Sequence, residues 1–350
     1  MTVKYQADSL IRFATNVLQT NGMQQDMAQD VAEVLVEGDL FGHDTHGLAL
    51  LKPYVDVLKK GNLKGRGEID ILSQRAAVAS WDGGYLAGPW LVRRGLDWAH
   101  KVAKEYGTAS LVIRRSSHIG ALAAYLEQPA RDGFMVQLMC SDPSVASVAP
   151  FGGTEPLVTP NPMSYGIPAS DEPILIDISA SITTNGMTGR LSSNGVKGDH
   201  QWWIDANGKP TTDPTVLETN PPGSLMPLGG MEAGHKGFSL ALFVESMTAG
   251  LAGHGRADDV NNWGATVYLQ LTDCSAFAGS GEFERQMQWL VDQSVANKPI
   301  NKEVPVRVPG QRALARKAGQ LQNGVTLHES IPPALAVLAK DAGIDLPEHG

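Results

Sequence analysis

The chain has 350 residues and a formal net charge of -9, with 42% hydrophobic and 19% charged residues. This length and composition predict a globular protein with a large core, either one domain with a subdomain or two closely joined domains. The negative charge is spread without long runs, which argues against nucleic acid or an anionic membrane as a partner.

The cysteine count and the apolar runs bear on where the protein resides. Two cysteines cannot form a disulfide framework, and no apolar run reaches the roughly 20 residues of a membrane span. The N-terminus lacks the apolar run of a signal peptide, so we expect a cytoplasmic protein. Cys140 lies in a predicted strand and is interpreted as an inert core thiol.

Apolar residues at helical spacing predict two helices at the start of the chain. Asp8 is expected to cap the first, which should end near Gly22, and the second should begin at about Asp26. The second helix leads into residues 42–47, Gly-His-Asp-Thr-His-Gly, which place two histidines, a carboxylate and a hydroxyl within four residues. Helical spacing resumes after this cluster and is expected to bring Lys52 to the same space.

The next part of the chain predicts alternating strands and helices. Short strands are expected over residues 69–83 and buried strands over 110–113 and 135–140, with a helix over 121–132 between the last two. The loop 116–120, Ser-Ser-His-Ile-Gly, follows the first buried strand directly. Proteins of the α/β class place ligands at such strand ends.

The second half of the chain is more varied. A strand over 174–179 precedes an irregular stretch, 185–234, with one hairpin signal at Asn207-Gly208. The segment Gly-His-Lys-Gly at 234–237 should then open a buried apolar helix over 238–251, whose N-terminal N–H groups and lysine would face a ligand.

The chain should close with one more strand and three helices. The strand is expected over 266–271, and closing helices over 313–322 and 329–342. Between the strand and the closing helices, the spacing of residues 282–295 predicts an amphipathic helix. Its inward residues would be Phe283, Met287, Leu290 and Val291.

Common nucleotide and hydrolase patterns are missing from the sequence. It contains no GxGxxG, no GxxxxGK[ST] and no GxSxG. Gly152-Gly153, the 234–237 segment and Arg312 nevertheless offer backbone donors and two cations, which a dinucleotide would need from a frame other than the Rossmann fold.

Two interpretations of His43, Asp44 and His46 are open. Histidines three residues apart on a helix can reach one metal ion, but no matching Cys or Glu-x-x-His partner occurs. Acid–base chemistry fits better, because imidazole titrates near neutrality and can pass a proton to a carbonyl oxygen as hydride reaches the carbon. His43 is interpreted as a structural histidine at a helix end.

Seven motifs follow one another along the chain. They are Gly-His-Asp-Thr-His-Gly (42–47), Ser-His-Ile-Gly (117–120), Pro-Phe-Gly-Gly (150–153), Thr-Pro-Asn-Pro (159–162), Asp-Ile-Ser-Ala-Ser (177–181), Gly-His-Lys-Gly (234–237) and Pro-Gly-Gln-Arg (309–312). In this order they resemble the type 2 malate/L-lactate dehydrogenase family. That family comprises NAD(P)-dependent oxidoreductases and includes ureidoglycolate, hydroxycarboxylate and sulfolactate dehydrogenases and the cyclic-imine reductases that act on piperideine-2-carboxylate.

The resemblance implies an α/β fold and a cofactor. A non-Rossmann nicotinamide-cofactor domain with a mixed sheet would span residues 116–310. A mostly helical second domain would be built from both chain ends, residues 1–115 together with 311–350. The resemblance also implies NAD or NADP as cofactor, no metal, a small carboxylate substrate, and a homodimer with active sites at domain and subunit boundaries.

The resemblance also carries roles to single positions. His46 would lie beside nicotinamide and substrate, and either it or His118 would carry the proton. Substrate-binding residues would be Thr45, Lys52 and Arg190. Cofactor-binding residues would be His46, Gly120, Ala121, Leu122, Asp177, Ile178, Ser179, Ala180, Ser181, Lys236, Gly310, Gln311 and Arg312.

Three positions depart from the pattern of the family. Thr45 stands where Ser is usual, and residues 231–233 look like an insertion. Leu50 stands where many members carry an arginine thought to grip the substrate carboxylate, so a bidentate contact is lost. Lys52, Arg190 or a group from the other subunit would have to replace it.

The leading hypothesis is hydride transfer between nicotinamide and C2 of a 2-oxo/2-hydroxy acid, with a cationic side chain holding the carboxylate. Reduction of a cyclic imino acid or oxidation of ureidoglycolate is the alternative within the family. A metal-dependent hydrolase or lyase using His43, His46 and His118 is a rival of another class, and a binding protein without catalysis is the third.

Overall fold

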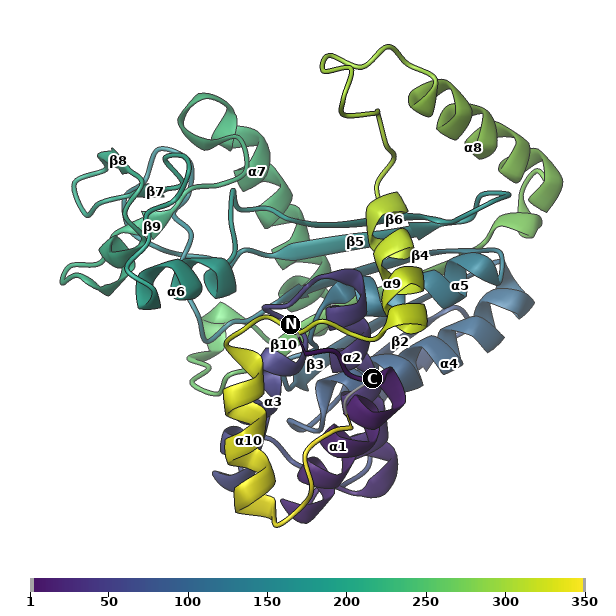
Figure 1. Ribbon diagram of the computed structural model, residues 1–350. Coiled ribbons are helices and arrows are strands. Elements are labelled where there is room, and N and C mark those ends of the chain that lie inside the picture. Colours follow the sequence, from purple (N-terminus) through teal and green to yellow (C-terminus); the bar gives the residue numbers. More distant parts are fainter. Residues whose placement is uncertain (1–2, 349–350) are drawn as a thin grey trace.

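A mixed seven-stranded sheet runs through the centre of the molecule, which the computed structural model describes over residues 3–348 (Figure 1). The strands, in spatial order, are β1 (Asp70–Arg75), β2 (Val78–Asp82), β3 (Thr108–Ser116), β10 (Ala265–Asp273), β4 (Phe134–Ser141), β5 (Pro162–Ile167) and β6 (Ile174–Ser179). Only the β2–β3 pair within this sheet is parallel. The predicted α/β class with a mixed sheet is confirmed, whereas the description by domains stays a prediction.

Strand β10 occupies the middle of the sheet although it comes late in the chain. It pairs with β3 on one side and β4 on the other, so the expected strand–helix–strand unit is split by an inserted strand. Leu269 faces the larger core, and Tyr268 faces a second core on the other side of the sheet. A strand covered on both faces is apolar nearly throughout, and the strand expected over 266–271 is confirmed as β10.

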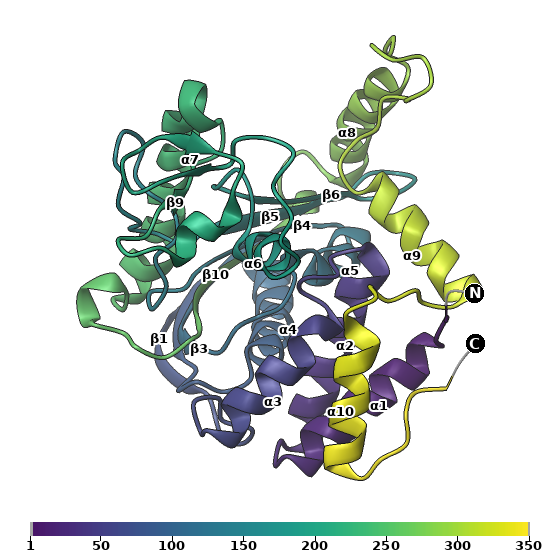
Figure 2. The same cartoon turned by 60° about the vertical axis from the view of Figure 1, so that its left-hand side comes forward.

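Helices from both chain ends cover one face of the sheet (Figures 1 and 2). They are α1 (Ala7–Thr20), α2 (Gln25–Phe41), η1 (Leu48–Leu50), α3 (Leu51–Lys59), α4 (Gly88–Tyr106), η2 (Leu122–Tyr125), α5 (Glu127–Arg131), α9 (Gln311–Asn323) and α10 (Ile331–Ala342). α1 contacts α10 and α2 contacts α9, so the two ends share one helical layer. No helix within residues 3–348 is long and apolar enough to cross a bilayer.

The first helix begins slightly differently from the prediction. α1 starts at Ala7 with Gln6 at the N-cap position, so Asp8 is not the cap. Asp8 instead lies in the first turn, where its carboxylate still favours the positive end of the helix dipole. α2 ends at Phe41 and is capped by Gly42, whose φ of +90° is a left-handed conformation that glycine adopts without strain.

A smaller lobe lies on the other side of the sheet and contains, over residues 185–229, several short elements that were not predicted. It holds α6 (Asn185–Ser193), β7 (Trp203–Ile204), β8 (Pro210–Thr211), η3 (Pro214–Glu218), β9 (Ser224–Leu225), α7 (Gly230–Glu245), the π-helical turn η4 (Ser246–Gly250) and η5 (Arg256–Asp258). The expected irregularity of residues 185–234 is therefore wrong, because these elements are too short to show periodicity. The hairpin around Asn207-Gly208 is confirmed, since β7 and β8 pair antiparallel.

Helix α7 differs from the prediction at its start and in its burial. It begins at Gly230, so the 234–237 segment lies inside it, just after a bend at Ala233. Leu242 and Phe243 on α7 are 52% and 46% exposed, so the expected burial of this helix is wrong. The helix packs on β4 with one side only, which leaves its other side uncovered.

Helix α8 (Ser280–Val295), which follows η6 (Cys274–Ala276), stands away from the body of the molecule (Figures 1 and 2). None of its residues is buried, and Trp289 and Leu290 are 59% and 49% exposed. The predicted helix forms, but the expected inward packing is wrong for Leu290, while Phe283, Met287 and Val291 are only partly buried. No apolar residue of α8 is fully covered by residues 3–348.

Candidate active site

The 42–47 segment is held in place by a buried carboxylate beneath it. Asp39, on the last turn of α2, accepts a hydrogen bond from the Leu48 N–H at 2.7 Å. A Cβ atom on Gly47 would lie 2.5 Å from both Asp39 carboxylate oxygens, so only glycine fits over this carboxylate. Thr45 and His46 are thereby directed into a cavity between the two cores.

The second polar loop meets the first. The hydroxyl of Ser117 accepts a hydrogen bond from the Gly88 N–H at 2.7 Å, which anchors the loop after β3 to the start of α4. The His118 ring stacks on His46 with centroids 5.9 Å apart, and on its other side Trp263 stacks at 4.9 Å. The structure thus brings together two histidines that are 72 positions apart in the chain.

The cavity that these rings share has a volume of about 300 Å³. Its wall is built by Thr45, His46, Leu50, His118, Ile119, Cys140, Asp142, Val145, Thr159, Pro160, Pro162, Ser179, Thr184, Asn185, Gly186, Trp263, Gly264 and Ala265. These residues come from the two histidine loops (residues 42–47 and 116–120) and from η1, from β4 and the loop after it, from the start of β5 and the loop before it, from the end of β6 and the start of α6, and from the start of β10 and the segment before it. This cavity is the candidate active site.

His118 is fixed by Tyr54 of α3. The Tyr54 hydroxyl donates to the His118 carbonyl oxygen at 3.0 Å, and its oxygen lies 2.8 Å from His118 Nδ1. The Gly120 N–H also donates to Nδ1, at 3.2 Å, so Nδ1 is held by two groups of the protein. Nε2 makes no hydrogen bond with residues 3–348. Burial, with a smaller effect from His46, lowers the pKa of His118 to about 3, so the ring is neutral at pH 7.

His46 is also neutral. Its Nδ1 lies 2.8 Å from the Thr45 hydroxyl, and its Nε2, like that of His118, makes no hydrogen bond with residues 3–348. Burial lowers its pKa to about 4, with further contributions from His43 and Arg190. Two neutral rings with available nitrogens at one cavity are suited to receiving a proton from a hydroxyl group.

Asp177 connects the predicted cofactor strand to the predicted cofactor loop. It lies inside β6, and its Oδ2 accepts a hydrogen bond from the Ala123 N–H at 2.9 Å and lies 4.0 Å from His43 Nε2. Burial raises the pKa of the Asp177 carboxyl. Gly120, Ala121 and Leu122 are buried behind this contact and do not line the cavity.

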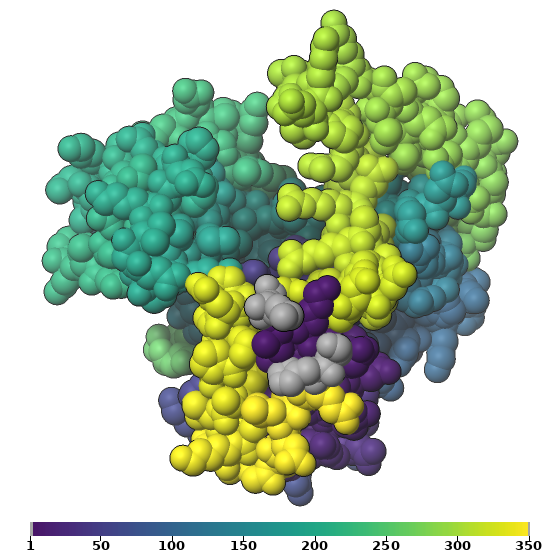
Figure 3. All heavy atoms as spheres, viewed as in Figure 1, coloured from purple at the N-terminus to yellow at the C-terminus, as the bar shows by residue number. Residues whose placement is uncertain are grey.

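The other predicted cofactor residues lie around a hollow over the edge of the sheet. Of residues 178–181, Ser179 lines the cavity, Ile178 is 42% exposed, and Ala180 and Ser181 are buried. Gly310 and Gln311 begin α9 beside Leu175 of β6, with an exposed Arg312, while Lys236 is exposed on α7. Figure 3 shows the molecule hollowed between the lobe that carries α7 and the arm that leads to α9.

Two of the predicted substrate-binding residues do not line the cavity. Lys52 Nζ pairs with Asp56 at 2.6 Å on the exposed side of α3, because the inward side of that helix is formed by Leu51, Tyr54 and Val55. Arg190 pairs with Asp44 at 3.0 Å behind the wall. The expected reach of Lys52 into this space is therefore wrong. Thr45 does line the cavity.

The residues that were expected to bind the phosphates of a dinucleotide together do not all lie in one place. Gly152 and Gly153 line a separate cavity of about 170 Å³ together with Met231. Gly234 lies near them, since a Cβ there would meet the Phe151 ring at 2.9 Å. Arg312 belongs to α9 on the other side of the hollow, so Gly152, Gly153, the 234–237 segment and Arg312 do not form one phosphate-binding site.

Several residues that line the cavity or support it carry no signal in the sequence. Tyr54 sits at an inward helical position, which indicates core packing and not contact with a histidine. Trp263 and the start of α6 belong to segments without periodicity. Cys140 was expected in the core, but it lines the cavity, where burial raises the pKa of its thiol and keeps it protonated.

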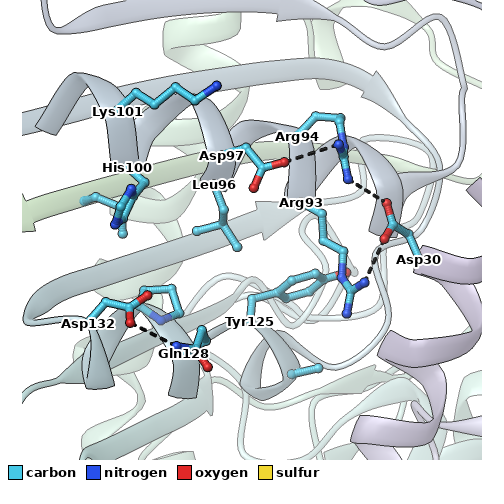
Figure 4. Close-up of a pocket in the computed structure, with 13 residues that line it drawn as sticks. Asp30, Arg93, Arg94, Leu96, Asp97, His100, Lys101, Tyr125, Gln128 and Asp132 are labelled. Atoms are coloured by element: carbon cyan, nitrogen blue, oxygen red, sulfur yellow. Dashed lines mark hydrogen bonds and ion pairs between the residues drawn. The ribbon is translucent and has the colours of Figure 1, made fainter. Parts of the chain in front are cut away.

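A larger cavity of about 650 Å³ lies between α4 and α5 (Figure 4). None of the predicted site residues lines it. Its arginines are already paired, Arg93 with Asp30 at 2.7 Å and Arg94 with Asp30 at 3.2 Å and Asp97 at 3.3 Å. Within residues 3–348, no three His, Cys, Asp or Glu side chains are grouped as a metal site.

The sequence model of the malate/L-lactate dehydrogenase family matches residues 5–336, so the chain belongs to this family. The chain is 27% identical to a malate dehydrogenase of Pyrococcus horikoshii, over 98% of this chain and 96% of that one. A crystal structure of malate dehydrogenase from Entamoeba histolytica superposes with a TM-score of 0.92 at 25% identity, covering 99% and 100% of the two chains. The Δ1-piperideine-2-carboxylate reductase of Pseudomonas syringae shares the fold, with a TM-score of 0.83, 24% identity and coverage of 96% and 99%.

Proposed function

We propose that the protein is an NAD(P)-dependent oxidoreductase that transfers hydride between nicotinamide and C2 of a small 2-oxo/2-hydroxy acid. The stacked pair of His46 and His118 in one cavity is the observation that carries this proposal. The related malate dehydrogenases support the same class of reaction. In the oxidation direction the hydroxy acid gives hydride from C2 to the nicotinamide and its hydroxyl proton to an imidazole, and reduction is the reverse.

The residues of the chain would supply the proton transfer and the positioning. His118 Nε2 takes the hydroxyl proton, while Tyr54, bonded to Nδ1, fixes the plane of the ring. His46 and Thr45 lie beside it and orient the substrate oxygen. Leu50 and Trp263 exclude water from the reacting atoms.

In this proposal an extended dinucleotide lies in the hollow between the lobe that carries α7 and the arm that leads to α9. When bound, the nicotinamide cofactor supplies the hydride acceptor or donor. Ser179 at the cavity would contact its nicotinamide half, and the exposed Lys236 and Arg312 offer cations to phosphate on either side. The backbone of the edge strand β6 provides a floor, with Ile178 exposed toward solvent.

A homodimer is part of the proposal. α8 has no buried residue, and its Trp289 and Leu290, with Phe277 just before it at 75% exposure, form an apolar surface that stands off the body. Exposed apolar patches of this kind mark protein interfaces, and a second copy of the chain would cover this one.

Reduction of a cyclic imino acid is the second candidate, because the fold is shared with a piperideine-2-carboxylate reductase and the cavity wall is largely apolar. Both candidates are tested by the fall in reduced-nicotinamide absorbance when 2-oxo acids and cyclic imines are added, with chelator as control. Activity lost on chelation would favour a metal-dependent hydrolase or lyase instead. Cofactor binding without turnover of any compound would favour a binding protein.

Residue roles are tested separately. His118→Ala should lower kcat far more than it weakens cofactor binding, whereas Lys236→Ala should weaken cofactor binding and leave kcat nearly unchanged. Equal small losses in both quantities for both variants would contradict the roles assigned to these two residues.

A further inference from the structure

The charge of the cavity wall restricts the substrate. Among the lining residues there is no lysine and no arginine, so the expected cationic side chain at the substrate carboxylate is not found in the described part of this chain. Nearby cations are already paired. Arg190 binds Asp44 at 3.0 Å, and Arg256 binds Glu245 at 3.0 Å and the Asp142 carbonyl oxygen at 2.9 Å.

One end of the cavity can still hold a carboxylate. Thr184 caps α6 by accepting hydrogen bonds from the Met187 N–H at 3.1 Å through its hydroxyl and from the Thr188 N–H at 3.0 Å through its carbonyl. The N–H groups of Asn185 and Gly186 are left at the start of the helix, where an anion is favoured.

This anchor lies next to the reacting groups. A Cβ on Gly186 would lie 3.2 Å from Thr45 Cβ and 3.6 Å from His46 Cε1. A carboxylate bound at the start of α6 therefore lies beside His46. The hydroxyl of Thr45 and the amide of Asn185 supply further polar contacts at this end of the cavity.

Within residues 3–348 of this chain, the remaining wall offers nothing to a second anion. Leu50, Ile119, Val145 and Trp263 are apolar, and Trp263 stacks on the proton-carrying His118. The one carboxylate in the wall, Asp142, is bonded to the Ser144 N–H at 2.9 Å and its hydroxyl at 2.7 Å, and repels a second anion whenever it is ionised.

We infer that the substrate carries a single carboxylate and an apolar group beyond C2, and that dicarboxylates and sulfonates are poor substrates. This inference rests on the proposed function and deepens it. The carboxylate binds at the start of α6, and the apolar group packs against Leu50 and Trp263. The inference applies to aliphatic and aromatic 2-oxo acids and also to cyclic imino acids, because all of these carry one anion and one apolar face.

The test compares kcat/KM for 4-methyl-2-oxopentanoate with that for oxaloacetate and 3-sulfopyruvate, at saturating reduced nicotinamide cofactor. We expect the apolar acid to be preferred at least about tenfold. Leu50→Arg should shift the ratio toward oxaloacetate by about tenfold or more, while the neutral control Leu50→Met leaves the ratio within about threefold.

The outcomes separate the two levels of the proposal. Turnover with preference for oxaloacetate or 3-sulfopyruvate in the unmodified protein overturns the single-carboxylate inference alone. Absence of turnover with every 2-oxo acid and cyclic imine, with either cofactor, overturns the proposed function and this inference with it. A ratio unmoved by Leu50→Arg contradicts the placement of the substrate against that wall.

Discussion

Replacing Asp39 by asparagine should change how stability depends on pH. The Asp39 carboxyl is buried under Gly47, its Oδ1 has no hydrogen-bond partner among residues 3–348, and burial raises its pKa from 3.8 to about 7. Since the folded state keeps this proton up to about pH 7 and the unfolded state loses it near pH 3.8, the free energy of unfolding falls as pH rises through that window.

The size of the effect follows from the shift in pKa. About three pKa units at 1.36 kcal/mol each give an upper limit of about 4 kcal/mol above pH 7 and roughly 1.6 kcal/mol at pH 5. The asparagine side chain does not titrate, so the Asp39→Asn variant should gain up to about 3 kcal/mol relative to the unmodified protein between pH 5 and pH 8. Any constant cost of the amide cancels in this difference.

Urea unfolding at pH 5 and pH 8 measures the difference in free energy of unfolding between the variant and the unmodified protein, which is called the gap below. His46 and His118 titrate in both proteins alike, so their effect is removed by the comparison. Asp56→Asn is the matched control, because Asp56 lies on the exposed side of α3 and should give a gap that does not vary with pH. A gap for Asp39→Asn that is equally constant would refute the picture of a buried carboxyl that keeps its proton under the histidine loop.

Four further outcomes are expected. Tyr54→Phe removes the oxygen bonded to His118 Nδ1 and should lower kcat by about tenfold to a hundredfold with little change in cofactor KM, measured by steady-state kinetics. Gly47→Ala should lower activity and melting temperature sharply, whereas Gly319→Ala in α9, with nothing near its Cβ, should change neither by much. Trp289→Asp should convert a dimer to a folded monomer in light scattering coupled to gel filtration, and a dimer that persists argues against α8 as the interface. Because burial keeps His118 neutral, kcat/KM for hydroxy-acid oxidation should stay flat from pH 5 to 8, while that for 2-oxo acid reduction falls as pH rises; parallel profiles would contradict this role.

The sequence predicted elements well wherever one side of a long element is buried by the same chain. α1, α2 and α10 show the helical spacing of apolar residues that the structure places in the larger core. The same spacing misled at α8, because periodicity states that a helix has an apolar side and not what covers it. Burial by another molecule leaves the same pattern as burial within the chain.

The candidate site shows a similar division. The two histidine loops were found because dense polar residues between helices and strands are rare, and both contribute to the cavity. Tyr54 and Trp263 were not found, since an aromatic residue at an inward position has the same sequence signature whether it contacts a histidine or a leucine. Only the placement of α3 and of the segment before β10 against the histidine loops distinguishes these roles.

Lys52 and Arg190 show why charge alone does not identify a ligand contact. Both lie within a few residues of cavity-lining positions, yet each is neutralised by a carboxylate on its own side of the wall, Asp56 and Asp44. A cation that is already paired must lose that partner before it can bind a substrate, which weakens any net gain. The free N–H groups at the N-terminus of a helix have no ion pair to break before they bind an anion. A site without free cations can therefore still select an anion, provided that only one anion enters.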